Sequence, residues 1–233
     1  MLGEGVSVAR VVEHEDFTGV YWVLEEDKRK LATKNLVPGF RSYNEQVVEY
    51  GGEEFRIWSP LRSKPAAAIV NGLRVFPVRS GSRILYLGIA SGTTASHFSD
   101  IIGRSGVIYG VEISDRPLRE LIKVCEARKN IVPIMGDARK PDEYSMYLEQ
   151  VDVIYADVAQ PFQAQIVVDN AVFLKDGGHV MLAIKASSID ATRPPDEVFT
   201  REVETLEKAG FKLRQVVSLE PFERKHALVV AEF

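Results

Sequence analysis

From residue 83 onward, short apolar runs alternate with segments that show helical periodicity. Apolar runs rich in branched residues predict buried strands, at 83–88, 107–112, 131–135, 151–157, 178–185, 211–219 and 226–232. Apolar residues at helical spacing predict helices between them, near 93–103, 115–129, 142–149, 161–174 and 195–209. Regular alternation of this kind is typical of a parallel sheet with helices on both faces.

The final two predicted strands are joined differently from the others. The linker 220–225 is too short to hold a crossover helix, and parallel neighbours in a sheet need such a crossover. The last strand must therefore run antiparallel to the strand before it. The pattern predicts a seven-stranded sheet with one reversed strand.

The first part of the chain has a different pattern. Alternating or β-branched runs predict strands, at 6–12, 19–24, 47–50 and 54–58. A turn at Gly51 and Gly52 would join the last two of these as a hairpin. We interpret the charged run 25–30 as a solvated turn and not as a site. This part of the chain therefore predicts a small antiparallel β module.

The boundary between the two parts is predicted at Ser59-Pro60. We expect a small β-rich N-terminal module over 1–58 and a main α/β domain over 59–233. No internal repeat or low-complexity segment divides the chain further.

A helix is predicted over 62–76, directly after this boundary. Ser63 is a candidate cap for it, and Pro65 suits its first turn. Lys64 then lies at the helix start, where the helix dipole disfavours a cation. This local conflict is a hint of function, although an exposed lysine before a helix would give the same sequence.

The turn after the first strand of the main domain contains Gly88 and Gly92 and leads into Thr93 and Thr94 at a helix start. Glycines let a backbone approach a ligand closely, and free N–H groups at a helix start bind polar atoms. The glycine spacing is not the dinucleotide one, so an ordinary βα turn stays an alternative. Glu112 lies 20 residues past Gly92, where nucleotide-binding folds hold ribose hydroxyls. With this acid, an adenosine-type cofactor is favoured.

Polar or small residues also follow the next strands. Ligands of open α/β sheets bind at the carboxyl ends of the strands. These ends carry Asp137 and Ala138 after the third strand, Asp157 and Gln160 after the fourth, and Lys185 after the fifth. Asp137 alone could be a helix cap, but here we expect it to accept a hydrogen bond from an adenine amino group.

A seven-stranded sheet with an acid after its second strand and a reversed last strand is the class I S-adenosylmethionine-dependent methyltransferase pattern, which is Rossmann-like. Methyl transfer to a hydroxyl requires an aligned nucleophile and removal of its proton. A lysine among other cations or in a dry pocket can act as the base, so Lys185 is the candidate, with Asp157 orienting it. His226 begins the last strand and can approach the same edge. A structural ion pair between Lys185 and Asp157 is the alternative.

Composition limits the other function classes. A formal net charge of −4 speaks against a broad basic surface that holds nucleic acid by itself, but not against RNA presented by a partner. The single cysteine, Cys125, excludes an intrachain disulfide and is expected to be a buried small hydrophobe. The histidines lack metal-ligand spacing, so no metal is predicted. Without a membrane-spanning apolar run or a signal-peptide core, we expect a soluble intracellular protein that does not bind membranes.

Several motifs together resemble fibrillarin. They are Tyr86-Leu-Gly-Ile-Ala-Ser-Gly-Thr-Thr-Ala-Ser-His97, Asp157-Val-Ala-Gln160, Glu223-Arg-Lys-His-Ala-Leu228, Asn35-Leu-Val-Pro-Gly39, Arg56-Ile-Trp58 and Ser63-Lys64. The resemblance covers essentially the whole chain. The glycine/arginine-rich N-terminal extension of eukaryotic fibrillarins is absent, so the chain resembles the short archaeal form. That form implies a cytoplasmic location in a cell without a nucleus.

The resemblance implies a class I methyltransferase that uses S-adenosyl-L-methionine. It implies methylation of ribose 2′-hydroxyls in pre-rRNA, and of tRNA as a further substrate. The family works inside the box C/D guide ribonucleoprotein. The implied partners are a Nop-domain scaffold protein, a kink-turn-binding protein of ribosomal type, the guide RNA and the target RNA. Delivery of the substrate by these partners would explain why the subunit itself is acidic.

The resemblance also implies site residues. The family's catalytic set falls on Lys64, Asp157, Lys185 and His226. We expect Lys185 to be the base, Asp157 to orient it, and Lys64 and His226 to support charge or RNA phosphate. The predicted cofactor-binding residues are Gly88, Ala90, Thr93, Thr94, Glu112, Ile113, Asp137, Ala138, Asp157 and Gln160. Pro65 follows Lys64 where the family pattern leads us to expect another residue, which can alter the helix start.

Three alternatives remain open at the level of the sequence. An NAD-dependent oxidoreductase would share half of the fold and the ribose-binding acid, but it would need a G-x-G-x-x-G turn that is absent. A non-catalytic assembly subunit would keep a vestigial pocket and tolerate loss of Lys185. Methylation of protein glutamine, described for eukaryotic family members, has no sequence feature here that tests it.

Overall fold

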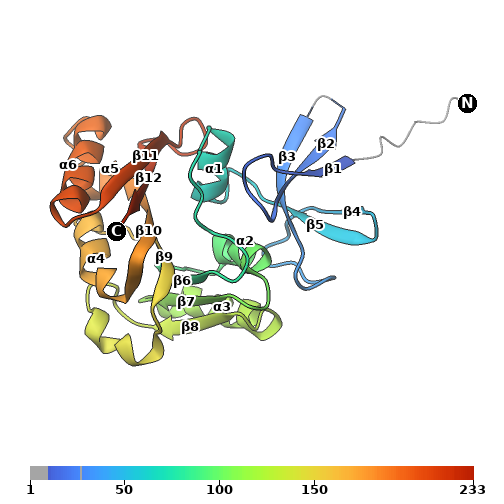
Figure 1. Cartoon of the computed structure of the whole chain (residues 1–233), viewed down its shortest axis with the longest axis horizontal. Helices are drawn as coiled ribbons and strands as arrows, with labels where there is room; N and C mark the ends of the chain where they lie inside the picture. The colour runs from blue at the N-terminus through green and yellow to red at the C-terminus, as the bar shows by residue number, and fades with distance from the viewer. Residues whose placement is uncertain (1–9, 27) are drawn as a thin grey trace, which may run out of the picture.

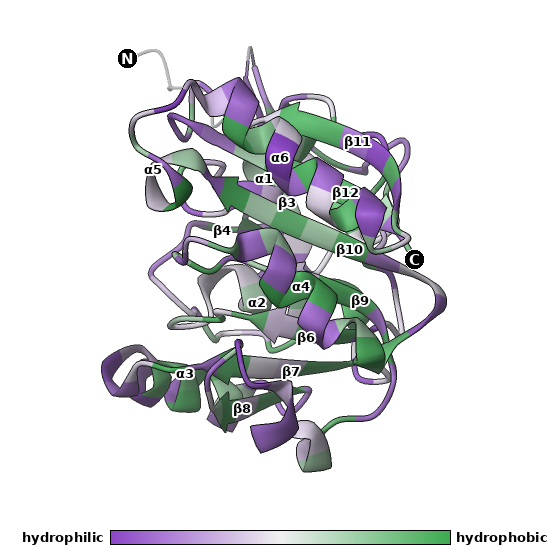
Figure 2. Ribbon diagram, turned by 90° about the vertical axis from the view of Figure 1, so that its left-hand side faces the viewer, coloured by the Kyte–Doolittle hydropathy of each residue, from purple (hydrophilic) through white to green (hydrophobic). Residues whose placement is uncertain are grey.

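The computed structural model describes residues 10–26 and 28–233. Two sheets organise them, as Figure 1 shows: a smaller N-terminal sheet and a larger sheet flanked by helices. Hydrophobic residues run along the strands of the larger sheet, whereas hydrophilic residues are prominent on the helices that flank it (Figure 2). No helix among the described residues is long and apolar enough to cross a membrane.

The N-terminal sheet is antiparallel throughout, with strand order β1-β2-β3-β5-β4. Its strands are β1 Arg10–Glu13, β2 Val20–Glu25, β3 Lys28–Lys34, β4 Val47–Tyr50 and β5 Glu53–Ile57. The predicted hairpin forms at Gly51 and Gly52, whose φ angles of 61° and 80° suit glycine. Of the strand predicted over 6–12, residues 6–9 lie outside the described residues.

The prediction for the charged run 25–30 was wrong in part, because β3 begins inside it at Lys28. The polar residues Lys28 and Arg29 are exposed, whereas Leu31, Ala32 and Thr33 are buried. Only the second half of the strand therefore carries the apolar signal of a buried strand. The ends of β2 and β3 pair at Glu25 and Lys28.

The main sheet confirms the predicted topology, with strand order β11-β12-β10-β9-β6-β7-β8. Its strands are β6 Arg83–Leu87, β7 Val107–Glu112, β8 Ile131–Met135, β9 Val151–Ala156, β10 Leu174–Lys185, β11 Lys212–Ser218 and β12 His226–Glu232. Strands β6 to β10 pair in parallel, and β12 runs antiparallel to both β10 and β11. One reversed strand therefore brings its first residue, His226, to the edge where the parallel strands end. We call this edge the carboxyl edge.

The helices differ from the predictions mainly in length. They are α1 Lys64–Val70, α2 Thr93–Ile102, α3 Asp115–Ala127, α4 Gln163–Asn170, α5 Ala186–Ile189 and α6 Pro195–Lys208, with 3₁₀ turns η1 Pro141–Glu143, η2 Ser145–Tyr147 and η3 Ala171–Phe173. The helix predicted over 62–76 stops early, because the chain leaves it through Gly72 at φ 91°. The helix predicted over 142–149 is replaced by η1 and η2. Tyr144 is its only fully buried side chain, so this stretch has no apolar face to hold a helix against the sheet.

The hydrophobic core joins the two sheets. Helices α1, α2 and α3 pack on one face of the main sheet in a core cluster that also contains Trp22, Leu31 and Trp58 of the N-terminal part. Helices α4 and α6 pack on the other face. Because both sheets share one cluster, the division into domains at residues 58 and 59 stays a prediction. Cys125 packs at the margin of this cluster, and burial raises the pKa of its thiol to about 11.

Candidate active site

The turn after β6 touches the strand end that carries Asp157. Gly88 has φ 77°, and a Cβ atom at this position would lie 2.5 Å from the carbonyl oxygen of Asp157. Only glycine fits this close approach. Gly92, at φ 87°, then turns the chain into α2. The first N–H groups of that helix have no partners inside it, which suits a polar ligand.

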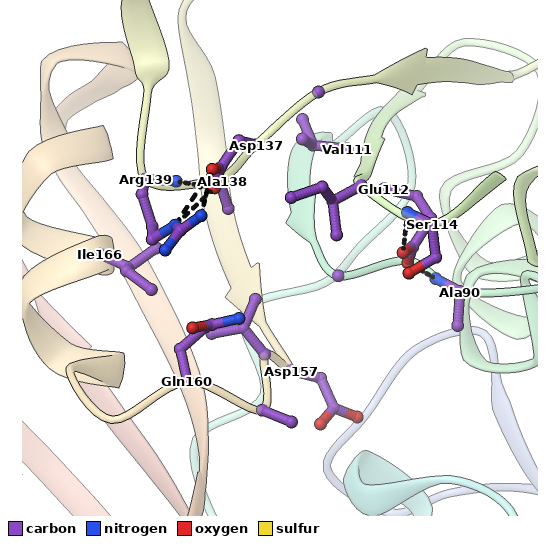
Figure 3. A pocket seen from close by; sticks show the side chains of 15 residues that line it. Ala90, Val111, Glu112, Ser114, Asp137, Ala138, Arg139, Asp157, Gln160 and Ile166 are labelled. Carbon is purple, nitrogen blue, oxygen red and sulfur yellow. Dashed lines mark hydrogen bonds and ion pairs between the residues drawn. The ribbon is translucent and has the colours of Figure 1, made fainter. Parts of the chain in front are cut away.

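Glu112 is held firmly at the end of β7. It is 8% exposed, and its carboxylate accepts hydrogen bonds from the N–H of Ala90 at 2.9 Å and the N–H of Ser114 at 2.8 Å. Figure 3 shows both bonds. The carboxylate thereby closes the glycine turn onto β7 while keeping further acceptor positions free for a ligand. Glu112 thus lies beside the glycine turn, and its role in holding ribose hydroxyls stays a prediction.

A cavity of about 250 Å³ opens between these elements (Figure 3). Eight of the ten predicted cofactor residues line it: Gly88, Ala90, Glu112, Ile113, Asp137, Ala138, Asp157 and Gln160. Thr93 and Thr94 do not line it, although they begin α2 directly after the same turn. The other residues that line the cavity were not among the predicted cofactor-binding residues: Val111, Ser114, Gly136, Arg139, Val158, Ala159 and Ile166.

Arg139 is the most consequential of the missed residues. Its Nε lies 2.9 Å from Oδ1 of Asp137 and its Nη2 lies 2.6 Å from Oδ2, and its backbone N–H also donates to Oδ1. These bonds, led by the side-chain one, hold the pKa of Asp137 below its usual value. An adenine amino group would have to share this carboxylate with the guanidinium. The sequence did offer a signal for this ion pair, because Arg139 follows Asp137 by only two residues and a short loop lets their side chains meet.

The predicted catalytic residues lie on the carboxyl edge, but they pair differently from our expectation. Asp157 forms an ion pair with Lys64, with 2.8 Å between Nζ and Oδ2. The two side chains are 17% and 29% exposed. We expected Asp157 to orient Lys185, yet among the described residues the structure gives Lys185 no ion pair. The helix dipole disfavours the positive charge of Lys64, and the carboxylate of Asp157, directly after β9, offsets this effect.

Lys185 and His226 lie opposite each other in the register of β10 and β12. The backbone N–H of Lys185 donates to the side-chain oxygen of Gln163 at 3.0 Å, which fixes the end of β10. His226 is 8% exposed. Its Nδ1 lies 2.8 Å from the carbonyl oxygen of Arg224 and therefore donates to it. Its Nε2 lies 3.5 Å from a carboxylate oxygen of Glu223.

The cavity suits a cofactor with an adenosine half and a positive charge. Glu112 offers a carboxylate where ribose hydroxyls would bind, and Ile113, Val158 and Ile166 offer apolar surface for a base. Asp157 places a further carboxylate at the side of the cavity that meets Lys64. Among the described residues, no group of three or more His, Cys, Asp or Glu side chains could hold a metal ion.

A family model described as Fibrillarin matches residues 11–233. The fibrillarin-like rRNA/tRNA 2′-O-methyltransferase of Methanopyrus kandleri is 57% identical over 222 residues, covering 94% of this chain and 96% of that relative. The chain belongs to the fibrillarin family. The resemblance drawn from the sequence motifs is thereby confirmed.

Two solved fibrillarin structures extend the comparison. Aeropyrum pernix fibrillarin, in complex with natively bound S-adenosyl-L-methionine, is 55% identical with a TM-score of 0.90, over 95% of this chain and 97% of that one. A chain of a fibrillarin/Nop5p complex is 41% identical with a TM-score of 0.84, over 95% of this chain and 100% of that one. Similarity at these levels over nearly the full length confirms the class I methyltransferase fold for this fibrillarin-family chain.

Proposed function

We propose that this chain transfers a methyl group from S-adenosyl-L-methionine to ribose 2′-hydroxyls of rRNA and tRNA. The observation that carries the proposal is the Lys64–Asp157 ion pair, since Asp157 also lines the cavity closed by Glu112. A charged pair at the mouth of an adenosine-sized cavity suits transfer to a polar acceptor. The archaeal relative that bears the name rRNA/tRNA 2′-O-methyltransferase supports the acceptor class.

The bound cofactor would be held by residues of three strand ends. Glu112 would accept hydrogen bonds from ribose hydroxyls, and Ile113 would pack against the base. Asp137 would accept from the adenine amino group beside Arg139, as expected from the sequence. The start of α2, with Thr93 and Thr94, would face the polar end of the cofactor. When bound, the cofactor supplies a methyl group on a sulfonium, which is its own leaving group.

The protein's own task is then to align the 2′-hydroxyl and to remove its proton. We assign the proton to Nζ of Lys185, because Lys185 ends β10 opposite His226 and, among the described residues, forms no ion pair with a carboxylate. Nζ of Lys185 would take the proton of the 2′-hydroxyl, and the bound cofactor would supply the methyl group to the 2′-oxygen and be left as a neutral thioether. Lys64, paired with Asp157, supplies a fixed positive charge near the reacting hydroxyl. His226 lies opposite Lys185 in the β10–β12 pair. Its imidazole would help to stabilise the charge on Lys185 after the proton has moved.

We further propose that partners deliver the RNA. The net charge of −4 leaves this chain poorly suited to hold RNA alone. A chain similar to it forms a complex with Nop5p. The proposed assembly contains a Nop-domain scaffold, a kink-turn-binding protein of ribosomal type and a box C/D guide RNA that selects the target.

The test is transfer of labelled methyl groups from S-adenosyl-L-methionine to RNA, by the chain alone and in the complete mixture of scaffold, kink-turn protein and guide. Label at one guide-selected ribose, dependent on the partners, is the expected result. Its position is mapped by resistance of the modified nucleotide to alkaline cleavage. Absence of label from the complete mixture, with cofactor binding demonstrated by calorimetry, would overturn the proposal.

A further inference from the structure

Ser63 occupies the cap position of α1 but does not cap the helix. A serine at this position normally accepts a hydrogen bond from a backbone N–H of the first turn. Its backbone has the extended conformation of a cap residue, at φ −150° and ψ 118°, yet its side chain makes no capping bond. Its hydroxyl lies instead 2.9 Å from the hydroxyl of Thr94. The first turn of α1 therefore lacks its usual capping hydrogen bond, because the serine hydroxyl contacts α2 instead.

This contact connects two parts of the candidate active site. Ser63 directly precedes Lys64, and Thr94 is the second residue of α2, directly after the glycine turn. Ser63 is 3% exposed and Thr94 is 6% exposed, so water cannot easily replace either partner. A buried hydroxyl left without its partner carries a desolvation cost. The contact therefore holds the start of α1 against the start of α2.

Tyr86 is a further buried polar side chain near this contact. Its ring is buried beneath the same edge, on β6, with an edge-to-face contact to Tyr155. Burial raises the pKa of Tyr86 well above its usual value, the negative charge of Asp157 raises it further, and the hydroxyl of Thr94 opposes both. Ser63, Thr94 and Tyr86 are all buried, so the contact between Ser63 and Thr94 is shielded from water.

We propose that Ser63 is a positioning residue for the methyl transfer proposed above: its contact with Thr94 fixes the backbone of Lys64, and so fixes the ammonium group against Asp157. The inference rests on that proposed function. A lysine at a helix start is otherwise free to swing into solvent on its long side chain. A small misplacement of a charged group at a reacting centre is costly to the rate and affects substrate binding much less.

The test compares Ser63→Ala with Ser59→Ala in the complete guide ribonucleoprotein. Ser59 is a matched control, because its hydroxyl is four residues earlier in the same segment and accepts only the N–H of Leu61, at 3.3 Å. Ser63→Ala is expected to lower kcat about tenfold with the KM for the cofactor within about twofold, as misalignment predicts. Ser59→Ala is expected to leave both constants unchanged. Cofactor affinity is also measured by calorimetry on the isolated chain, and should be equal in both variants.

A second measurement separates positioning from simple stability. Combined with Lys64→Ala, the Ser63→Ala change should produce no further fall in kcat, because Ser63 acts through that lysine. A merely structural serine would lower the rate equally in either background. The Ser63→Cys variant replaces the hydroxyl by a weakly hydrogen-bonding thiol without leaving a void, and guards against loss of folding. It should show the same rate loss with an unchanged urea midpoint.

The outcomes are distinct. Wild-type protein that transfers no label overturns the proposed function. Active wild-type protein with full activity in Ser63→Ala or Ser63→Cys overturns the positioning role alone. Full additivity with Lys64→Ala, or a rise in the cofactor KM that matches the fall in kcat/KM, also overturns it.

Discussion

Two clusters of charged residues differ in burial and in pairing, and the difference separates structure from chemistry. The buried cluster, between the N-terminal sheet and α2, consists of Glu45, Arg56, Asp100 and Arg128. Their charged side chains are at most 1% exposed. The edge cluster consists of Lys64, Asp157, Lys185 and His226 on the carboxyl edge. There the Lys64–Asp157 pair remains partly exposed, and Lys185 has no ion pair in the part of the chain that the structure describes.

In the buried cluster each charge is matched. Arg56 contacts Glu45 at 2.5 Å and Asp100 at 2.7 Å, and Arg128 contacts Asp100 at 2.5 Å. Thr33 donates its hydroxyl hydrogen to Asp100 at 2.7 Å. Such pairing offsets the cost of removing these charges from water, although Nε of Arg128 is buried without a hydrogen-bond partner among the described residues. A group that must exchange a proton cannot be matched so completely, and the edge cluster keeps that freedom.

Removing Asp100 should produce the largest effect. Asp100→Asn leaves two buried guanidinium groups without their shared carboxylate, and breaking a buried pair costs about 3–5 kcal/mol of unfolding free energy. Urea denaturation followed by circular dichroism measures this loss. Asp176→Asn is the control, because Asp176 is exposed, and it should leave the urea midpoint unchanged. Equal effects of the two variants would show that the buried cluster does not hold the sheets together.

Removing Lys64 should produce the opposite profile. Lys64→Ala is expected to lower methyl transfer at least about 100-fold, the scale of a lost catalytic group. The unfolding free energy should change by less than about 1 kcal/mol, since partly exposed ion pairs contribute little. Lys34→Ala, which removes an exposed ion pair with Glu53, serves as the control for activity. A large loss of stability in Lys64→Ala would show that the edge cluster, like the buried cluster, serves mainly to stabilise the fold.

Within the edge region, cofactor binding and proton removal should separate. Glu112→Ala removes the acceptor for Ala90 and for ribose hydroxyls, so we expect about tenfold weaker cofactor binding, the scale of hydrogen bonds to a charged group. Lys185→Ala should keep cofactor affinity and lose methyl transfer. Calorimetry and label transfer on the same preparations test both. An equal loss of cofactor affinity in the two variants would contradict this division of roles.

The smallest expected effect concerns pH and His97 of the buried region. Its ring is fully buried between Thr33, Tyr43 and Trp58. Burial, and then the charges of Arg56 and Arg128, lower its pKa well below 6.5. The folded state therefore keeps this ring neutral while the unfolded chain takes up a proton. Stability from this group is full above pH 6.5 and is lost as the pH falls below that value, by up to about 1.4 kcal/mol per pH unit.

Urea denaturation at pH 7 and pH 5.5 checks this sign. The wild-type protein should lose about 1 kcal/mol more than His97→Gln over this interval, because the variant has no proton to take up. The tautomer is assigned by the hydrogen bonds: Thr33 donates to Asp100, so Nδ1 of His97 donates to Thr33, and Nε2 accepts from Tyr43. A steeper loss of stability in His97→Gln than in the wild type would contradict the lowered pKa of His97.

The sequence predicted the main sheet well because its strands carry continuous apolar runs, including the reversed β12. It failed at β3, where only the second half is buried. It also failed at 142–149, where apolar residues stand at helical spacing but only Tyr144 is buried. Local pattern also could not decide which lysine Asp157 would meet. Lys64 and Asp157 are far apart in the sequence, and their pairing depends on how α1 crosses the sheet. The buried cluster escaped prediction for the same reason, because its charges come from four separate segments.

The reversed direction of β12 also governs how the sequence can change. His226 reaches the carboxyl edge as the first residue of its strand, and its register opposite Lys185 is set by hydrogen bonds along β10 and β12. The preceding segment, 219–225, also holds the imidazole, because Nδ1 donates to the carbonyl oxygen of Arg224 and Nε2 lies near the carboxylate of Glu223. A slip of one residue within β12 would turn His226 to the opposite face of the sheet. Insertions at 223–225 and single deletions inside the strand should therefore both displace the imidazole, and neither should be tolerated in related chains.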